Sequence, residues 1–170
     1  MAKKVDAQDY IDPTAPDAGL QAAIDAGLEG GALALPAGTF ELKRSLTLKS
    51  NMTFSGVGPE TRLTTPEDLP CEPLLADTAE GDETVRVERA HAFEIGAEVT
   101  VRDRERNGWN ATFAIVAGIE GKSLRLDRPL KKAYETGEDA QIVHAFPMLR
   151  AESADSLTIQ LLRIAGHGPF

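Results

Sequence analysis

Apolar residues between positions 33 and 54 come in pairs separated by a single residue: Leu33/Leu35, Phe40/Leu42, Leu46/Leu48 and Met52/Phe54. Such alternation is typical of β-strands with one buried face. The gaps between the pairs are too short for helices, and no Asn-Gly or Asp-Gly turn marks a tight hairpin. The pattern therefore predicts short strands that are joined by neither helices nor tight hairpins.

The spacing of these pairs indicates a winding chain. Leu33 precedes Met52 by 19 residues, Leu35 precedes Phe54 by 19, and Leu42 precedes Leu63 by 21. Intervals near 20 residues lie at the low end of the range for solenoid repeats. We expect parallel strands in which Leu33 and Leu35 stack beneath Met52 and Phe54, and Leu42 beneath Leu63. The corners are marked by Pro36, Gly38, Gly56 and Gly58.

One helix is predicted, over residues 17–29. Its apolar face consists of Leu20, Ala23, Ile24, Gly27 and Leu28. Asp17 is a suitable N-cap, and Gly30-Gly31 a suitable stop. We expect this helix to cover the first open end of the solenoid. The polar residues 1–16 are expected to form an extended lead-in.

The winding is expected to be interrupted between residues 83 and 145. This segment contains longer, more regular strand patterns, at 83–89, 97–102, 112–120, 123–127 and 139–145. Gly121-Lys122 reads as a short hairpin turn, and five strands in this length suit a small β-barrel. The sequence of residues 155–159 resembles that of residues 50–54, so the winding is expected to resume there.

The predicted organisation has four parts and an all-β fold. Residues 1–16 form the lead-in, and 17–82 the capping helix with the first turns of the solenoid. Residues 83–145 form an inserted small β-barrel-like module. Residues 146–170 form resumed strands, and the chain is expected to stop while a third circuit is under way.

The stretch GLQAAIDAG, followed by GGALALPAGTFELKRSLTLKSNMTFSGVGPETRL, resembles the start of right-handed parallel β-helix proteins of the pectate-lyase-like superfamily. In those proteins a capping helix precedes a G-G-x-φ-x-L-P-x-G-T-[FY] segment and an S-N-[VM]-T-[FL]-x-G-x-G element. Nearly every element is present between Leu20 and Leu63. The later sequence VRVERAHAFEIGAEVTVRD resembles, more loosely, an inserted β module found in some members.

The resemblance implies an N-terminal portion of a carbohydrate-active protein, either a polysaccharide lyase or a glycoside hydrolase, itself lacking a complete active site. The alternatives are a non-catalytic structural or glycan-binding module, oligomeric as in tailspike-like fibres, or an engineered solenoid fragment. The family's catalytic groups lie on middle turns, so none is carried over to this chain. The resemblance also implies an extracellular or periplasmic location, although residues 1–12 contain no apolar stretch typical of a signal peptide.

The charge balance restricts the partners. Eighteen Lys and Arg stand against 27 Asp and Glu, a net charge of −9. An acidic surface argues against sequence-independent nucleic-acid binding and against anionic membranes, and no apolar run reaches the roughly 20 residues needed to span a bilayer. A local basic groove on such a surface still suits an anionic polysaccharide.

The candidate glycan site is the segment 102–110, which contains the only Trp. We select Arg104, Arg106 and Trp109, because sugar rings stack on aromatic faces and guanidinium groups bind hydroxyls or uronates. The alternatives are a charged hairpin whose Trp packs against the module, and a subunit contact. Glycoside hydrolysis needs two carboxyl groups across a cleft, for which Glu105 with Asp103 or Asp127 are the candidates.

Metal and cofactor sites have weak support. Asp6, Asp9, Asp12 and Asp17 invite a calcium interpretation, but the EF-hand spacing is missing. The histidines, at 91, 144 and 167, are too scattered for zinc. Gly56-Val-Gly58 lacks the third glycine and the helix of a dinucleotide site. Cys71 is the only cysteine and has no activating neighbour. We therefore expect no cofactor.

The last strand candidates, Leu157–Ile159 and Leu161–Ile164, are apolar and lie near the end of the chain. A solenoid cut after two or three turns exposes backbone groups at its last edge. We therefore expect a homo-oligomer that forms through residues 157–164.

Overall fold

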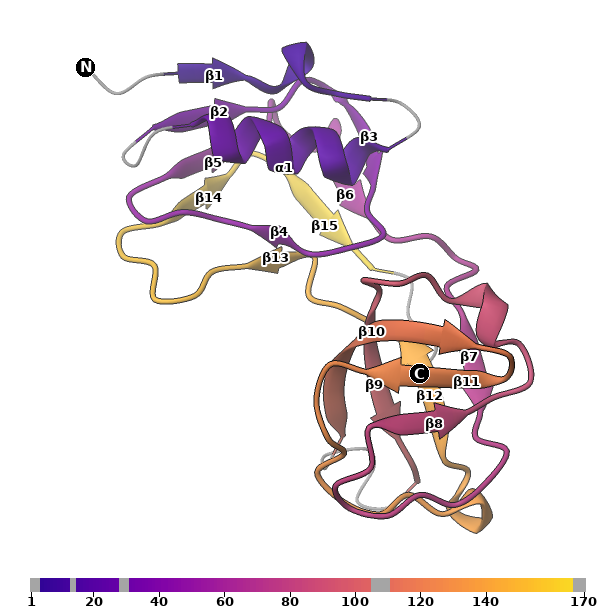
Figure 1. Ribbon diagram of the computed structural model, residues 1–170. Coiled ribbons are helices and arrows are strands. Elements are labelled where there is room, and N and C mark those ends of the chain that lie inside the picture. The colour runs from indigo at the N-terminus through magenta and orange to yellow at the C-terminus, as the bar shows by residue number, and fades with distance from the viewer. Residues whose placement is uncertain (1–3, 13–14, 28–30, 105–110, 167–170) are drawn as a thin grey trace. The chain divides into compact units, whose positions relative to one another are not determined.

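The computed structural model describes residues 4–12, 15–27, 31–104 and 111–166 (Figure 1). These residues are mostly β-strand, with one α-helix. They divide into two compact units. Unit 1 comprises the chain up to Glu67 and again from Pro147, and unit 2 comprises residues 68–146. Each unit is described by itself.

Unit 1 contains three sets of parallel strands. The first set is ordered β1 (Lys4–Asp6), β2 (Ala32–Ala34), β5 (Thr53–Ser55) and β14 (Thr158–Gln160). The second set contains β3 (Gly38–Glu41), β6 (Thr61–Thr64) and β15 (Arg163–Ala165), and the third pairs β4 (Leu46–Thr47) with β13 (Leu149–Arg150).

Successive strands along the chain belong to successive sets, so the chain winds. We call β2–β3–β4 the first coil, β5–β6–β13 the second coil and β14–β15 the third coil. Each strand pairs in parallel with its equivalent in the next coil. Side chains at paired positions therefore point to the same face in all coils.

The predicted stacking register is wrong by two residues. Leu33 pairs with Phe54, where Met52 was expected, and Phe40 pairs with Leu63, where Leu42 was expected. Because side chains alternate with period two, a slip of two residues keeps the same face inward. All of these apolar residues are accordingly buried, as expected.

The resumption of the winding after the interruption is confirmed. Thr158 pairs with Thr53, and Ile159 pairs with Phe54. This is the register at which the sequence of residues 155–159 repeats that of residues 50–54. The central ladders of unit 1 are therefore Leu33–Phe54–Ile159 and Phe40–Leu63–Ile164.

Helix α1 (Pro16–Ala26) is shorter than predicted. Pro16 occupies the first turn, where its missing N–H costs nothing, and Asp17 is not the N-cap. Asp17 is instead buried inside the helix and accepts from Arg44 Nε at 2.9 Å. The backbone N–H of Gly27 closes the last turn, and Leu28 and Gly30 lie outside the described residues.

The helix lies along the first coil. Leu20, Ala23 and Ile24 are fully buried, and each of the two larger side chains contributes about 1.5–3 kcal/mol by leaving water. The Gln21 amide binds both backbone groups of one β4 residue: its Oε1 accepts from Thr47 N–H at 2.8 Å, and its Nε2 donates to Thr47 O at 3.3 Å. The helix thereby satisfies the edge of β4 that no strand pairs in the described structure.

The lead-in is more structured than expected. β1 pairs in parallel with β2, and a short 3-10 helix, η1 (Ala7–Asp9), follows it. Gly19 allows this segment to approach α1, because a Cβ there would lie 2.2 Å from Tyr10 O.

Unit 2 is an antiparallel sheet ordered β7 (Cys71–Pro73), β12 (Gln141–His144), β9 (Glu98–Arg102), β10 (Thr112–Glu120), β11 (Ser123–Leu126) and β8 (Thr84–Arg86). The sheet curls into a half-barrel (Figure 1). An isolated antiparallel bridge joins Leu74 and Val87, which directly follow the two edge strands β7 and β8. The described residues of unit 2 also form two 3-10 turns, η2 (Ala90–Ala92) and η4 (Thr136–Glu138).

The expected module boundary differs from the observed unit. Five predicted strands are present within a few residues, and the hairpin at Gly121-Lys122 is confirmed by the β10–β11 pairing. The prediction missed β7, whose Cys71-Glu72-Pro73 sequence lacks an apolar alternation, so unit 2 begins at Asp68 rather than residue 83. Unit 2 thus occupies the chain between β6 and β13, where the first coil has only residues 42–45.

Candidate functional site

The predicted glycan segment leaves the half-barrel at the end of β9 and returns at the start of β10. Arg104 is described, whereas Glu105, Arg106 and Trp109 lie outside the described residues. The structure therefore defines the two ends from which this segment is presented.

Arg104 is bound at one of these ends. Its side chain is 65% exposed and forms an ion pair with Asp139. Its backbone N–H donates to Glu138 O at 2.8 Å. A ligand would meet a guanidinium that is held by the 136–139 turn, with several N–H donors directed to solvent.

Buried polar side chains support the same end of unit 2. Asp103 forms an ion pair with Lys132 at 2.7 Å, with side-chain exposures of 5% and 19%. The Lys132 ammonium also lies 5.2 Å from the centre of the Tyr134 ring. Removing either charge would leave the other in a poorly hydrated place, so the pair fixes where the segment begins.

Tyr134 ties the other end of the segment to the core. It is fully buried, and its hydroxyl lies 2.7 Å from Thr112 Oγ1. Thr112 Oγ1 also accepts from Lys131 N–H at 3.0 Å. Burial raises the pKa of Tyr134, so the phenol stays protonated and can keep this hydrogen bond. Arg104 and Thr112 are therefore both firmly held.

The expected pair of catalytic carboxyl groups gains no support from the local chemistry. Asp103 is already paired with Lys132. The hydrogen bond from Arg128 holds the pKa of Asp127 below its usual range, and Asp127 Oδ1 also accepts from Ile115 N–H at 2.7 Å. A general acid in glycoside hydrolysis needs a raised pKa, so Asp127 does not suit that role.

The other sequence candidates have structural partners. Asp6 accepts from Gln8 N–H at 3.0 Å and begins η1, and Asp17 binds Arg44. The Cys71 thiol donates to Gln141 Oε1 at 2.9 Å, and burial raises its pKa, which disfavours the reactive thiolate. Within the described residues, no group of three or more His, Cys, Asp or Glu side chains could hold a metal ion.

The Gly56–Thr61 stretch forms the corner between β5 and β6 within the second coil. Thr61 is fully buried; its Oγ1 accepts from Val57 N–H at 3.0 Å and donates to Pro36 O at 3.0 Å. The hydroxyl therefore joins the second coil to the first. A dinucleotide site would need a helix at this position, and a strand follows instead.

Sequence analysis missed a shallow hollow on unit 2. It has a volume of about 300 Å³ and is lined by residues of three adjacent strands, among them Gly118, Ser123 and Arg125. The regular alternation of β10 and β11 could have identified the face, but a bulge between Val116 and Gly118 shifts the pairing. None of the described helices is long and apolar enough to cross a membrane.

Comparison with known proteins finds similarity among solved structures. No family model and no curated protein matches the chain. The tailspike gp61 of Pseudomonas phage phi297 is 13% identical, with a TM-score of 0.44, and is aligned over 95% of this chain and 36% of the tailspike. The Gp54 tailspike of Acinetobacter baumannii bacteriophage AP22, solved in complex with A. baumannii capsular saccharide, is 12% identical, with a TM-score of 0.43. It is aligned over 98% of this chain and 30% of the tailspike.

The tailspike gp49 of Pseudomonas phage LKA1 is 16% identical, with a TM-score of 0.39, and is aligned over 79% of this chain and 26% of its own. The chain thus spans about a third or less of the length of these tailspikes. At such TM-scores and identities, the likeness carries no inference about activity.

Proposed function

We propose that this chain is the N-terminal portion of a carbohydrate-active right-handed parallel β-helix protein of the pectate-lyase-like kind. The observation that carries the proposal is the parallel, in-register stacking of three coils, with α1 along the first. Right-handed crossovers are the rule for parallel strands of one sheet. The G-G-x-φ-x-L-P-x-G-T-F segment between residues 30 and 40 supports the same assignment.

Within this protein, unit 2 acts as a glycan-binding module. Arg104 and the neighbouring Arg106 and Trp109 contact the saccharide, presented from the ends fixed by the Asp103–Lys132 pair and by Tyr134. The lowered pKa of Asp127 disfavours this residue as a general acid. Lyase or hydrolase chemistry belongs to the complete protein, and the non-catalytic alternative predicts binding with no cleavage at all.

The single Trp of the chain gives a direct test. Trp109 emission is followed while acidic, neutral and capsular polysaccharides are added, because a sugar stacked on the indole changes its surroundings. The same mixtures are read at the ultraviolet band of unsaturated uronates, which reports lyase cleavage. We expect binding by at least one polysaccharide without product formation.

Matched variants locate the binding. Arg104→Ala should weaken binding, whereas Arg128→Ala, which removes another exposed arginine paired with an acid, should leave it unchanged. A polysaccharide panel that leaves the emission and the mobility of the chain unaltered would contradict the glycan role. Cleavage by this chain alone would replace the binding role by an enzymatic one.

We also propose that the chain forms a homo-oligomer through the third coil. Ile159 and Ile164 continue the central ladders of unit 1 but are 43% and 48% exposed. The corresponding residues of the earlier coils are buried. This proposal is independent of the glycan role and is tested separately below.

A further inference from the structure

We propose that the outward face of β8, β10 and β11 in unit 2 binds a sugar ring that carries a carboxylate, as a second contact of the glycan module. The inference rests on the carbohydrate role proposed above and assigns a ligand class to a face outside the 102–110 segment. Its evidence is the arrangement of six residues on neighbouring strands.

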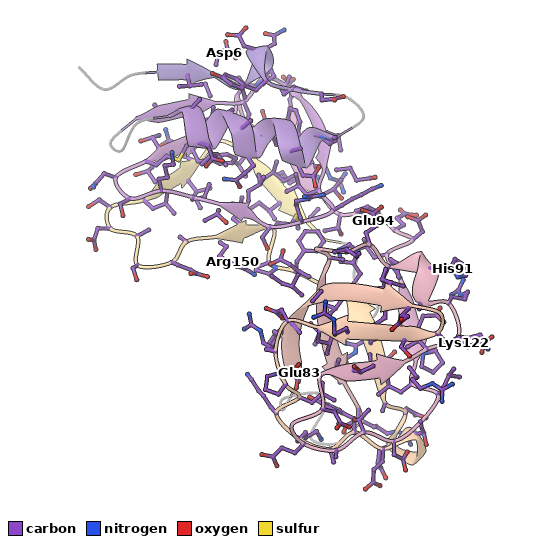
Figure 2. The ribbon with its side chains drawn as sticks, in the orientation of Figure 1. Asp6, Glu83, His91, Glu94, Lys122 and Arg150 are labelled. Carbon is purple, nitrogen blue, oxygen red and sulfur yellow. The ribbon has the colours of Figure 1, made fainter. Side chains whose placement is uncertain are left out.

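The strand register places these side chains in two rows. Glu120 pairs with Ser123, which pairs with Arg86, and Gly118 pairs with Arg125, which pairs with Thr84. The intervening Leu124 and Val85 are fully buried, so the two rows point away from the core. Figure 2 marks the strand ends with Glu83, where the chain enters β8, and Lys122, in the turn between β10 and β11.

Long and short side chains alternate within the rows. In the first row the short Ser123 lies between the long Glu120 and Arg86. In the second row the long Arg125 lies between the short Gly118 and Thr84. A hollow of about 300 Å³ is lined by Thr84, Gly118, Ile119, Glu120, Ser123 and Arg125. The three short positions all belong to this lining, and Glu120 and Arg125 supply its charged groups.

A β-bulge fixes the position of one wall. The register of β10 against β11 shifts between Val116 and Gly118, and the carbonyl of Ala117 accepts from Arg125 Nη2 at 3.2 Å. The guanidinium lies against Gly118, where a Cβ would come within 3.3 Å of Nη2 and 3.4 Å of Nε. Bulges of this kind redirect a side chain from the regular direction of a strand.

The available groups suit an acidic sugar. Ala117 takes one of the guanidinium N–H groups of Arg125, which leaves donors for a ligand carboxylate. In the part of the chain that the structure describes, neither Arg125 nor Arg86 forms an ion pair, although the whole chain carries a net charge of −9. The Glu120 carboxylate and the Ser123 and Thr84 hydroxyls can bind sugar hydroxyl groups.

The test is a titration of the full chain, followed by the backbone amide signals in NMR. Glucuronate is the probe, and glucose and acetate supply the ring and the carboxylate separately. We expect glucuronate to shift the amides of Gly118, Glu120, Ser123 and Arg125 with a Kd in the millimolar range, and either single component to bind at least about tenfold more weakly.

Two variants remove the site in different ways. Arg125→Ala should raise the Kd for glucuronate about tenfold, because a charge-assisted pair is lost. Gly118→Ala keeps the arginine but displaces it and should also weaken binding. Arg128→Ala, three residues further on, serves as the matched control and should bind like the parent.

The outcomes separate this inference from the glycan role. Shifts confined to Arg104, Glu138 and Asp139 would overturn the hollow as a site while supporting the proposed function. Equal binding of acetate and glucuronate would show an anion site without sugar recognition and would overturn the ligand class. Shifts that persist in Arg125→Ala would also overturn it. A lack of shifts, together with polysaccharide-induced changes in Trp109 emission, would overturn only the hollow.

Discussion

Asn51 and Ser156 occupy the same corner of two successive coils, although 105 residues separate them. Both have left-handed backbones, with φ of 56° and 53°, and Asn51 N–H donates to Asp155 O at 2.7 Å. Asp155 N–H in turn donates to Ser50 Oγ at 3.3 Å. The whole of unit 2 lies between them in sequence, yet the winding resumes with the same turn.

This continuity predicts that unit 2 can be removed. In the deletion variant, Thr64 is joined to Leu149 by a four-residue link with the sequence of residues 42–45, which make the equivalent corner of the first coil. The remaining chain keeps the β5–β14, β6–β15 and β4–β13 pairings. We expect a soluble protein with one cooperative thermal transition. A soluble product without such a transition would show that unit 1 requires unit 2 for its packing.

Gly56→Ala tests the contact between coils. A Cβ at this position would lie 2.4 Å from Leu161 O and 2.6 Å from Thr61 Cβ, so the second and third coils would have to separate. We expect the free energy of unfolding to fall by about 1–3 kcal/mol in urea titrations. Gly137→Ala is the control, because nothing lies within 4 Å of its added Cβ. Equal midpoints for the two variants would contradict the close approach.

Much of unit 1 could be predicted because one rule governs it. Alternation gave the faces of Leu33, Phe40 and Phe54 correctly, and the repeated SNMTF-like sequence marked the resumption at Thr158. The register between the first two coils could not be predicted in the same way. Met52 is apolar like Phe54, and a slip of two residues leaves the same face buried. The choice between pairing Leu33 with Met52 and pairing it with Phe54 depends on the hydrogen-bonded corners.

The candidate site was less accessible to sequence reasoning. Arg104 could be selected from its charged surroundings, but its pairing with Asp139 joins residues 35 positions apart. The bulge that places Arg125 over Gly118 has no local signal beyond the glycine itself. β7 escaped notice because its inward residue is Glu72, a buried acid paired with Arg89, in place of an apolar one.

Gln21→Ala tests whether α1 closes the edge of β4. The variant loses two hydrogen bonds to Thr47 while leaving the buried face of the helix intact. We expect a loss of about 1–2 kcal/mol in the free energy of unfolding. Gln160→Ala, an exposed glutamine of β14, should stay within about 0.5 kcal/mol of the parent. If both variants unfold at the same urea concentration as the parent, the contact with Thr47 does not stabilise the edge.

Asp77 predicts a pH dependence in unit 2. Its Oδ1 accepts from both the N–H and the Oγ1 of Thr136 at 2.7 Å, and the backbone hydrogen bond is the main reason that its pKa lies below the usual value. A lowered pKa stabilises the fold at neutral pH, and this contribution is lost as the pH falls below about 4. The melting temperature of Asp77→Asn should therefore lie below that of the parent at pH 7, and the difference between the two should become smaller towards pH 3. If the difference in melting temperature became larger as the pH falls, the pKa of Asp77 would be raised rather than lowered, and the prediction would be wrong.

Self-association through the third coil is the last prediction. In the described structure β14, β15 and β13 each pair on one side only, with β5, β6 and β4. Ile159 and Ile164 would be buried by another strand layer, as Phe54 and Leu63 are. The charges of residues 147–166 cancel, since Arg150 and Arg163 balance Glu152 and Asp155, so the net charge of −9 lies elsewhere in the chain.

The expected partner is a second copy of the chain, and the two copies are expected to contact each other through their third coils. At the other end of unit 1, β1 covers β2 and the Gln21 side chain covers β4, so a head-to-tail filament is disfavoured and a closed dimer is favoured. Sedimentation velocity over a range of concentrations should show a monomer–dimer equilibrium. At 0.1 M salt the screening length is about 10 Å, which limits repulsion between the acidic surfaces.

Charged substitutions test this contact. Ile159→Lys and Ile164→Lys should each shift the equilibrium to monomer, because both place an ammonium group in the apolar face. Ile95→Lys is the matched control, since Ile95 is 69% exposed but belongs to unit 2. Circular-dichroism melts establish that each variant is folded. A parent that sediments as a monomer at every concentration, or a dimer that both third-coil variants leave intact, would refute the contact.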